Sequence, residues 1–298
     1  MALTQTKTLA ACPLCGGAEF DSKFICKDYT VSKENFQIVA CRVCQFHFTN
    51  PRPADEDLGK YYESEDYVSH SNTSKGLVNW LYQRVRAFTL RKKLALVNRL
   101  SGKGILVDLG CGTGYFLNTC KQDGWNAIGI EPSPQARKVA SEQFGLEVLD
   151  EPGLQQMKPG SIDAITMWHV LEHVPDLHKR TEELKRILKP GGVLIIAVPN
   201  RSSYDAQHYG EHWAAWDVPR HLWHFAPADI ARLFEAHGME VKETLPMRFD
   251  SYYVSMLSEK YKSGSTSLIS AFLTGARSNR KAGSSPRFSS QIYVIRNK

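Results

Sequence analysis

The stretch VDLGCGTGYF, residues 107–116, decides the fold. It opens with a short apolar run typical of a buried strand, and the residues from Tyr115 onward suit a helix. Gly110, Gly112 and Gly114 stand between the two. Glycine allows a tight turn and a close approach of the backbone to a ligand, and the helix that follows offers free amide donors. We therefore predict a ligand-binding loop between a strand and a helix.

The spacing of these glycines argues against a pyrophosphate site. A G-x-G-x-x-G dinucleotide fingerprint needs a small residue at the position of Tyr115. The next strand, NAIGIE, ends at Glu131, whose carboxylate can accept hydrogen bonds from two ribose hydroxyls. The loop and the acid together predict an adenosine-containing ligand.

Strand and helix patterns alternate from residue 101 onward, which predicts an α/β fold with a mainly parallel, doubly wound sheet. A helix over residues 76–100 precedes this region, and its basic residues are predicted to form a solvated face. Residues 263–290 are rich in Ser, Gly, Arg and Lys and are predicted to form a mobile loop. The predicted strands are GILVDLG, NAIGIE, LEVLD, IDAITMWH, VLIIAVPN, MEVKETLPM and QIYVIRN.

The composition of the 298-residue chain, 42% hydrophobic and 23% charged, is that of a globular protein with a sizeable core. A net charge of 37 − 31 = +6 permits a nucleic-acid partner but does not favour one. No apolar run reaches membrane-spanning length and the first residues lack a signal-peptide core, so we expect a cytoplasmic protein without a membrane partner. The oligomeric state stays open.

Four of the seven cysteines are spaced for metal binding. Cys12 and Cys15 form one C-x-x-C knuckle, Cys41 and Cys44 form another, and two such turns complete a tetrahedral zinc site. A closed four-sulfur site leaves no open position for chemistry, so we predict a structural zinc in a module with its own core. Cys26 and His47 remain spare candidates for a ligand, without knuckle spacing. Few basic residues lie between the knuckles, which argues against RNA binding.

Four motifs, VDLGCGTGYF, GIEPS, DAITMWHVLEHVPD and LKPGGVLIIAVPN, resemble class I S-adenosylmethionine-dependent methyltransferases over roughly residues 101–248. The resemblance implies a seven-stranded Rossmann-like sheet whose last strand is antiparallel, and S-adenosylmethionine as cofactor. MWHVLEHV is similar to the ubiquinone- and menaquinone-type enzymes, and the cysteine module to that of bacterial sugar C-methyltransferases. The residues that the resemblance implies for cofactor binding are Asp108, Gly110, Cys111, Gly112, Gly114, Tyr115, Glu131, Pro132, Asp150 and His169.

We predict three parts along the chain. Residues 1–57 form the zinc-ribbon module, and residues 58–100 form a loop and a covering helix. Residues 101–298 form the methyltransferase domain, with a substrate lid at about 200–226 and the mobile loop at about 263–290.

The lid contains the run DVPRHLWHF, residues 217–225. Ligands of doubly wound folds lie beyond the carboxyl ends of the strands, so the lid should overhang the cofactor. The sugar C-methyltransferases carry a His-Glu-His segment before a similar helix. His221 matches its second histidine, whereas Pro219 and Arg220 replace the first histidine and the acid. We hypothesise that His221 is the general base, that Arg220 anchors an anionic acceptor, and that His224 or Tyr204 assists.

Three functions are weighed on these grounds. The leading one is methyl transfer from S-adenosylmethionine to a small-molecule or carrier-linked acceptor that is sugar-like or anionic. The second is an rRNA or tRNA methyltransferase, because zinc ribbons often contact nucleic acid. The third is a zinc-ribbon binding protein with a catalytically idle methyltransferase-like domain, against which the intact glycine loop and Glu131 argue.

Overall fold

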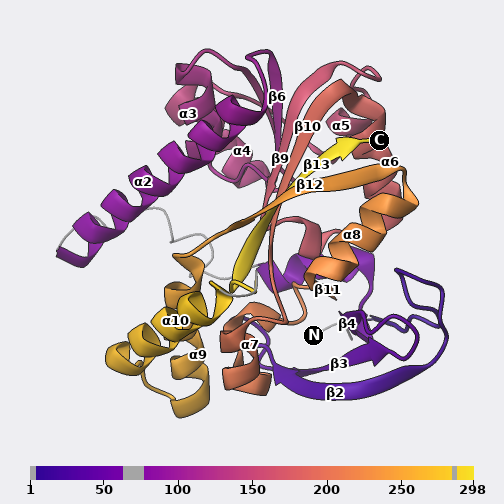
Figure 1. Cartoon of the computed structure of the whole chain (residues 1–298), viewed down its shortest axis with the longest axis vertical. Coiled ribbons are helices and arrows are strands. Elements are labelled where there is room, and N and C mark those ends of the chain that lie inside the picture. Colours follow the sequence, from indigo (N-terminus) through magenta and orange to yellow (C-terminus); the bar gives the residue numbers. More distant parts are fainter. Residues whose placement is uncertain (1–4, 63–76, 284–286) are drawn as a thin grey trace.

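The computed structural model describes residues 5–62, 77–283 and 287–298, and a seven-stranded sheet runs through its centre (Figure 1). Its strands are β6 (Ile105–Leu109), β7 (Asn126–Ile130), β8 (Glu147–Leu149), β9 (Ile162–Trp168), β10 (Leu188–Pro199), β12 (Met239–Pro246) and β13 (Ser290–Asn297). The order is β12-β13-β10-β9-β6-β7-β8. Only β13 runs antiparallel to its neighbours. The predicted doubly wound sheet is confirmed.

Helices cover both faces of this sheet because successive strand residues point to opposite sides. Leu106 packs on one face and Val107 on the other. The first face is covered by α2 (Leu77–Leu100), α3 (Tyr115–Gln122) and α4 (Pro134–Phe144), and the second by α5 (Glu151–Gln155), α6 (Leu177–Ile187) and α8 (Pro227–Ala236). No helix of the described residues is long and apolar enough to cross a membrane.

A second, four-stranded sheet lies below the first and is not built from the N-terminal module alone. Its order is β11 (Trp223–His224), β4 (His47–Thr49), β3 (Asn35–Cys41) and β2 (Phe20–Lys27), so the lid supplies an edge strand. A short pair, β1 (Thr6–Lys7) and β5 (Arg52–Pro53), and the 3-10 helix η1 (Asp55–Tyr62) complete the module. Residues 63–76, part of the predicted loop, lie outside the described residues.

The expectation that the cysteine module has a separate core is wrong. Cys41 and Phe46 belong to the same buried cluster as Val107 of β6 and Leu177 of α6. The reason is that the lid strand β11 pairs with β4 and carries Trp223 into this cluster, which joins the module to the central sheet.

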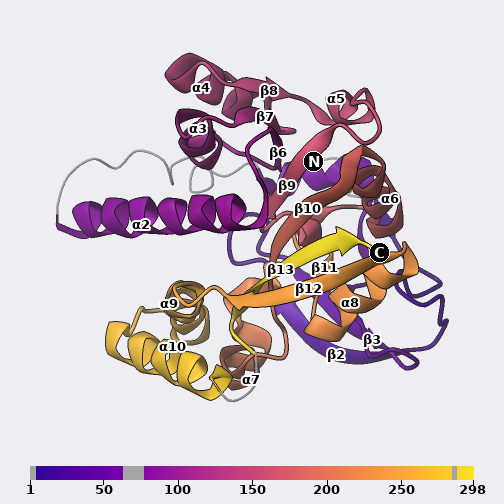
Figure 2. The same cartoon turned by 45° about the horizontal axis from the view of Figure 1, so that its top comes forward.

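The prediction of a mobile loop at 263–290 is also wrong, because α10 (Leu268–Ala282) forms there and packs against α9 (Asp250–Ser263). Ser267 caps the start of α10, and Gly275 allows close contact with α9, since an added Cβ would lie 2.8 Å from the Tyr252 ring. The lid itself folds into α7 (Tyr204–Tyr209) and the 3-10 helices η3 (Gly210–His212) and η4 (Ala214–Trp216). Figure 2 shows the α9–α10 hairpin beside α7, at the edge of the molecule.

Candidate functional site

The glycine loop follows β6. The strand order reverses next to it, because β7 and β8 lie on one side of β6 and β9 lies on the other. Gly110 and Gly114 are required by the fold, because both have positive φ (66° and 83°) and a Cβ would lie 2.5 Å from Val170 and Leu146 respectively. Gly112 also has positive φ, at 54°, yet a Cβ there would meet nothing within 4 Å. The space in front of Gly112 is therefore open to a ligand.

Glu131, directly after β7, holds the loop from its other side. One carboxylate oxygen accepts a hydrogen bond from the Gly112 amide and the other from the Ser133 amide, both at 2.9 Å. Each carboxylate oxygen has a second lone pair. Glu131 can therefore keep both amides and still accept hydrogen bonds from a diol.

Two ionisable side chains, Asp108 and Lys93, lie close to the loop, and sequence reasoning missed the placement of Lys93. Burial raises the pKa of Asp108 to about 7, although Thr166 donates a hydrogen bond to it at 2.5 Å. Lys93 of α2, predicted to be solvated, instead lies with its Nζ 4.2 Å from the centre of the Trp168 ring. Burial lowers the pKa of Lys93, against the opposing effect of Asp108 and Asp250, and Lys93 forms no ion pair with any described residue.

The remaining residues implied for cofactor binding differ in their exposure to solvent. The Tyr115 ring lies under the Arg86 guanidinium at 3.9 Å. Burial raises the pKa of the Cys111 thiol, which favours a packed residue over a nucleophile. Pro132 is exposed after β7, and Asp150 is exposed after β8, where it caps α5 through the Gly153 amide at 3.3 Å.

Glu172, His173 and His221 meet just beyond the end of β9, where Glu172 and His173 lie in the 3-10 helix η2 (Leu171–His173). The His221 Nε2 lies 4.0 Å from a Glu172 oxygen, and the rings of His173 and His221 are 4.6 Å apart. The fully buried Glu172 carboxylate receives no hydrogen bond from the described residues. Glu172 was not singled out from the sequence, although its place beside His173 was a usable signal.

The protonation of the two imidazoles follows from their partners. His221 Nδ1 lies 2.8 Å from the Ala215 carbonyl oxygen, and His173 Nδ1 lies 3.0 Å from that of Arg220. His221 Nδ1 faces the Ala215 carbonyl oxygen and must donate, so the Nε2 of its neutral ring carries a lone pair. His173 Nδ1 also lies 2.9 Å from the Tyr62 hydroxyl, which can donate to it, so either nitrogen of that ring can carry the proton. The His221 lone pair and the Glu172 carboxylate thus converge, which favours a proton or a cation between them. All three ligand atoms lie within 4.8 Å of one another, so these residues can also hold a metal ion.

His169, which the family resemblance implies as a cofactor residue, lies between Glu172 and Asp250. Its Nε2 lies 3.0 Å from Asp250, the first residue of α9, and its Nδ1 lies 3.4 Å from Glu172. Burial acts to lower the pKa of His169, but the two carboxylates outweigh it and raise that pKa to about 10. His169 is therefore a cation at neutral pH, and it ties the α9–α10 hairpin to the end of β9.

This shift predicts a pH dependence of stability. A raised folded-state pKa stabilises the folded protein fully below the unfolded value of 6.5, and the contribution is lost as pH rises through about 10. We expect the free energy of unfolding, measured in urea at pH 7 and pH 10, to fall more for the native chain than for His169→Gln. Equal losses in both proteins would contradict the ion pair.

Three of the predicted catalytic residues are not arranged as expected. Arg220 is buried, and its donors already bind Asp217, Asp28 and the Tyr61 carbonyl oxygen, which argues against an anchor for an anionic acceptor. His224 lies in β11 and contacts the Thr49 hydroxyl at 3.2 Å, and burial lowers its pKa well below the usual value. Tyr204 stacks on His208 and under Lys281. Only His221 joins the cluster.

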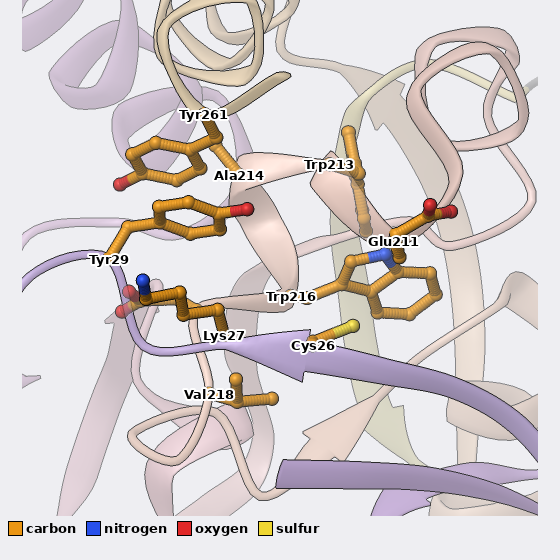
Figure 3. Close-up of a pocket in the computed structure, with 10 residues that line it drawn as sticks. Cys26, Lys27, Tyr29, Glu211, Trp213, Ala214, Trp216, Val218 and Tyr261 are labelled. Atoms are coloured by element: carbon orange, nitrogen blue, oxygen red, sulfur yellow. The ribbon is translucent and has the colours of Figure 1, made fainter. Parts of the chain in front are cut away.

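A small pocket opens between β2 of the lower sheet and the lid (Figure 3). The rings of Tyr29 and Tyr261 stack at one side of it, 4.1 Å apart, and Trp213 and Trp216 lie at the other. Asp217 also lines the pocket, and its carboxylate lies 3.9 Å from His221 Nε2. The pocket thus borders the cluster through Asp217.

The four knuckle cysteines come together at the far end of the lower sheet. The Cys12 and Cys44 sulfurs are 3.6 Å apart, those of Cys15 and Cys41 are 3.5 Å apart, and all four lie within 4.8 Å of one another. Tetrahedral zinc–sulfur bonds of about 2.3 Å place sulfurs roughly 3.8 Å apart, so the residues fit a zinc ion. Cys26 lines the pocket instead, and His47 Nδ1 contacts the Gln45 carbonyl oxygen.

Comparisons with known proteins agree with this geometry. Residues 80–244, more than half of the chain, match the family model described as a methyltransferase domain. A ubiquinone biosynthesis O-methyltransferase from Thiobacillus denitrificans is 30% identical over 164 residues, which are 51% of this chain and 70% of the relative.

Among solved structures, geranyl diphosphate C-methyltransferase from Streptomyces coelicolor A3(2) has a TM-score of 0.51 at 15% identity, over 79% of this chain and 87% of that one. Phosphoethanolamine N-methyltransferase 2 from Haemonchus contortus also has a TM-score of 0.51 at 15% identity, over 84% and 62%. At such low identity the likeness concerns the fold.

Proposed function

The chain belongs to the methyltransferase-domain family and is an S-adenosylmethionine-dependent methyltransferase, and from this premise we propose that it methylates a hydroxyl of a small-molecule acceptor, with His221 as general base. The observation that carries the proposal is the convergence of the His221 and Glu172 lone pairs after the end of β9, where Val170 lies against Gly110 of the glycine loop. The O-methyltransferase relative supports a hydroxyl acceptor. Because all three guanidinium nitrogens of Arg220 already donate hydrogen bonds within the protein, this residue does not support an anionic acceptor.

The donor site in this proposal uses the open loop, Glu131 and Lys93. The open side of Gly112 accommodates the methionine chain, and Glu131 binds the ribose hydroxyls. The methionine part of the donor carries a carboxylate, and the Lys93 ammonium group, which pairs with no acid in the described parts of the chain, lies above Trp168 near the end of β9. Lys93 therefore binds that carboxylate, which offsets the cost of burying its charge.

Glu131→Ala is expected to weaken binding of S-adenosylhomocysteine by about 1.5–3 kcal/mol, or roughly 10- to 150-fold, because charge-assisted hydrogen bonds to the ribose are lost. Titration calorimetry measures the change. Glu131→Gln is the matched control, since its amide oxygen still accepts one hydrogen bond and the loss should be smaller. Tight NAD binding without S-adenosylhomocysteine binding would contradict the donor site.

The methyl carbon of a sulfonium is already electrophilic, so the protein must align the two reactants and remove the proton of the acceptor. His221 Nε2 is the lone pair available for that proton, and the buried Glu172 stabilises the imidazolium that forms. The acceptor enters from the small pocket between β2 and the lid, which borders His221 through Asp217 and where the rings of Tyr29 and Tyr261 are partly exposed.

A screen of acceptor classes tests the function. We expect methyl transfer from labelled S-adenosylmethionine to catechol-type phenols or to hydroxyls of sugar nucleotides, and none to total tRNA or rRNA. Preferential labelling of RNA would overturn the small-molecule acceptor in favour of the second function weighed above.

The four knuckle cysteines hold one structural zinc in this proposal. Their number completes a tetrahedron, so the ion contributes folding energy and offers no open position for substrate. Zinc here holds the module against the central sheet, because Cys12 and Cys41 belong to the shared buried cluster.

A further inference from the structure

The helix α10 turns its bulky apolar residues outward. Leu268 is 67% exposed, Ile269 77% and Phe272 61%, and Leu273 is also exposed. These positions fall on one side of the helix, because residues three or four apart share a face and the four positions are linked by such spacings. The helix is therefore amphipathic, with its apolar face on the outside.

The inward face of α10 consists of small and polar residues whose partners are already provided. Ala271, Thr274 and Gly275 are buried against the neighbouring helices. Ser278 donates a hydrogen bond to Asp205 of α7 at 2.6 Å, and Ser270 donates one to Glu259 of α9 at 2.6 Å. This polar packing fixes the orientation of the helix, so its apolar face cannot turn inward without breaking these bonds.

The charge around the apolar face has one sign. Between Lys260 and Arg287 the chain has six basic residues and no acidic one. Lys262, Arg277 and Arg280 are exposed. The match to the methyltransferase family model ends at residue 244, so this hairpin lies outside it.

We propose that the outer face of α10 docks on the surface of an anionic lipid bilayer. Apolar side chains on one face of a helix, flanked by lysine and arginine, are the features of a helix that lies in the membrane interface. No described helix is suited to span a bilayer, so the helix lies along the surface. A second copy of the chain is a poorer occupant, because pairing two such faces would bring like charges together, whereas anionic headgroups attract them.

The position of α10 permits such contact. Figures 1 and 2 both show the α9–α10 hairpin at the edge of the molecule. Its helix α9 contacts the lower sheet near the end of β2, where Tyr261 stacks on Tyr29, whereas the apolar residues of α10 are exposed. His169 and Asp250 connect the start of α9 to the end of β9, so docking would hold the site close to the bilayer.

Vesicle flotation of the full chain tests the proposal. The native protein is expected to float with vesicles of phosphatidylcholine and phosphatidylglycerol, to float weakly with phosphatidylcholine alone, and to detach as salt rises. The double variant Ile269→Asp/Phe272→Asp should lower the partition coefficient on anionic vesicles more than about tenfold, and Arg277→Gln/Arg280→Gln should lower it severalfold.

Ile25→Asp is the matched control, because Ile25 is 67% exposed on β2 of the four-stranded sheet and lies outside α10. Its replacement should leave flotation unchanged. All variants should keep native S-adenosylhomocysteine affinity, since the altered side chains are exposed. Melting temperatures should stay native except for a small decrease in the α10 variant, which loses the contact between the Phe272 and Tyr252 rings. The proposal is overturned if the native protein ignores anionic vesicles, or if Ile25→Asp lowers flotation as much as the α10 variant. A dimer in sedimentation that only the α10 variant abolishes, without vesicle binding, would assign the face to a second copy.

Discussion

Replacing His221 by alanine is expected to lower turnover by roughly 10²–10⁴-fold and to leave the affinity for S-adenosylhomocysteine nearly unchanged. The imidazole lies in the cluster with Glu172 and His173, whereas the glycine loop and Glu131 do not depend on it. Turnover is measured with an acceptor identified in the screen, and donor affinity by calorimetry. Added imidazole should restore part of the lost rate, because the space left by the side chain lies beside the acceptor pocket.

His224→Ala is the matched control for this prediction. His224 is a buried histidine three positions further along the same lid, but it contacts Thr49 in the lower sheet. Its loss should lower stability and leave the turnover of the folded enzyme within a few-fold of native. If His221→Ala methylates the acceptor at the native rate, His221 belongs only to the packing of the lid.

Chelation distinguishes a general base from a bound metal ion in the cluster of Glu172, His173 and His221. With a general base, turnover should survive mild chelation that leaves the cysteine-bound zinc in place. Loss of turnover on chelation, restored by a divalent ion in the native protein but not in Glu172→Gln, would show that Glu172, His173 and His221 hold a metal instead.

Cys41→Ser is expected to reduce bound zinc from about one ion per chain to near zero, because the remaining three thiols cannot close the tetrahedron. Cys41 is fully buried and belongs to the cluster that reaches Val107 of the central sheet. The damage should therefore spread beyond the module and loosen the lid strand β11 as well. Metal analysis and hydrogen exchange over residues 217–225 measure the two effects.

Cys26→Ser is the control for the zinc prediction, because Cys26 is a buried thiol of the same module that lies outside the four-sulfur cluster. The Cys26→Ser variant should keep its zinc, and the amides of its lid should stay protected from hydrogen exchange. Purified native protein without zinc, in which all four knuckle thiols react freely, would exclude the metal site.

Features set by neighbouring residues could be predicted from the sequence alone. The positive φ of Gly110 and Gly114 requires glycine, and the apolar runs of period two and their alternation with helices follow from backbone geometry. These local rules predicted the central sheet and the loop that it presents. The spacing within each C-x-x-C turn likewise depends on a few consecutive residues, and the structure brings the two turns together.

Features that depend on a distant partner were decided only by the tertiary structure. Arg220 appeared available to a substrate until Asp28, 192 positions away, was placed against it. Glu172 gained its significance only beside His221, which the lid returns to the end of β9. The composition of residues 263–290 suggested a loop, yet their serines and glycine pack α10 against α7 and α9. Sequence periodicity shows which residues share a face, whereas the partner of that face depends on contacts between segments far apart in the chain.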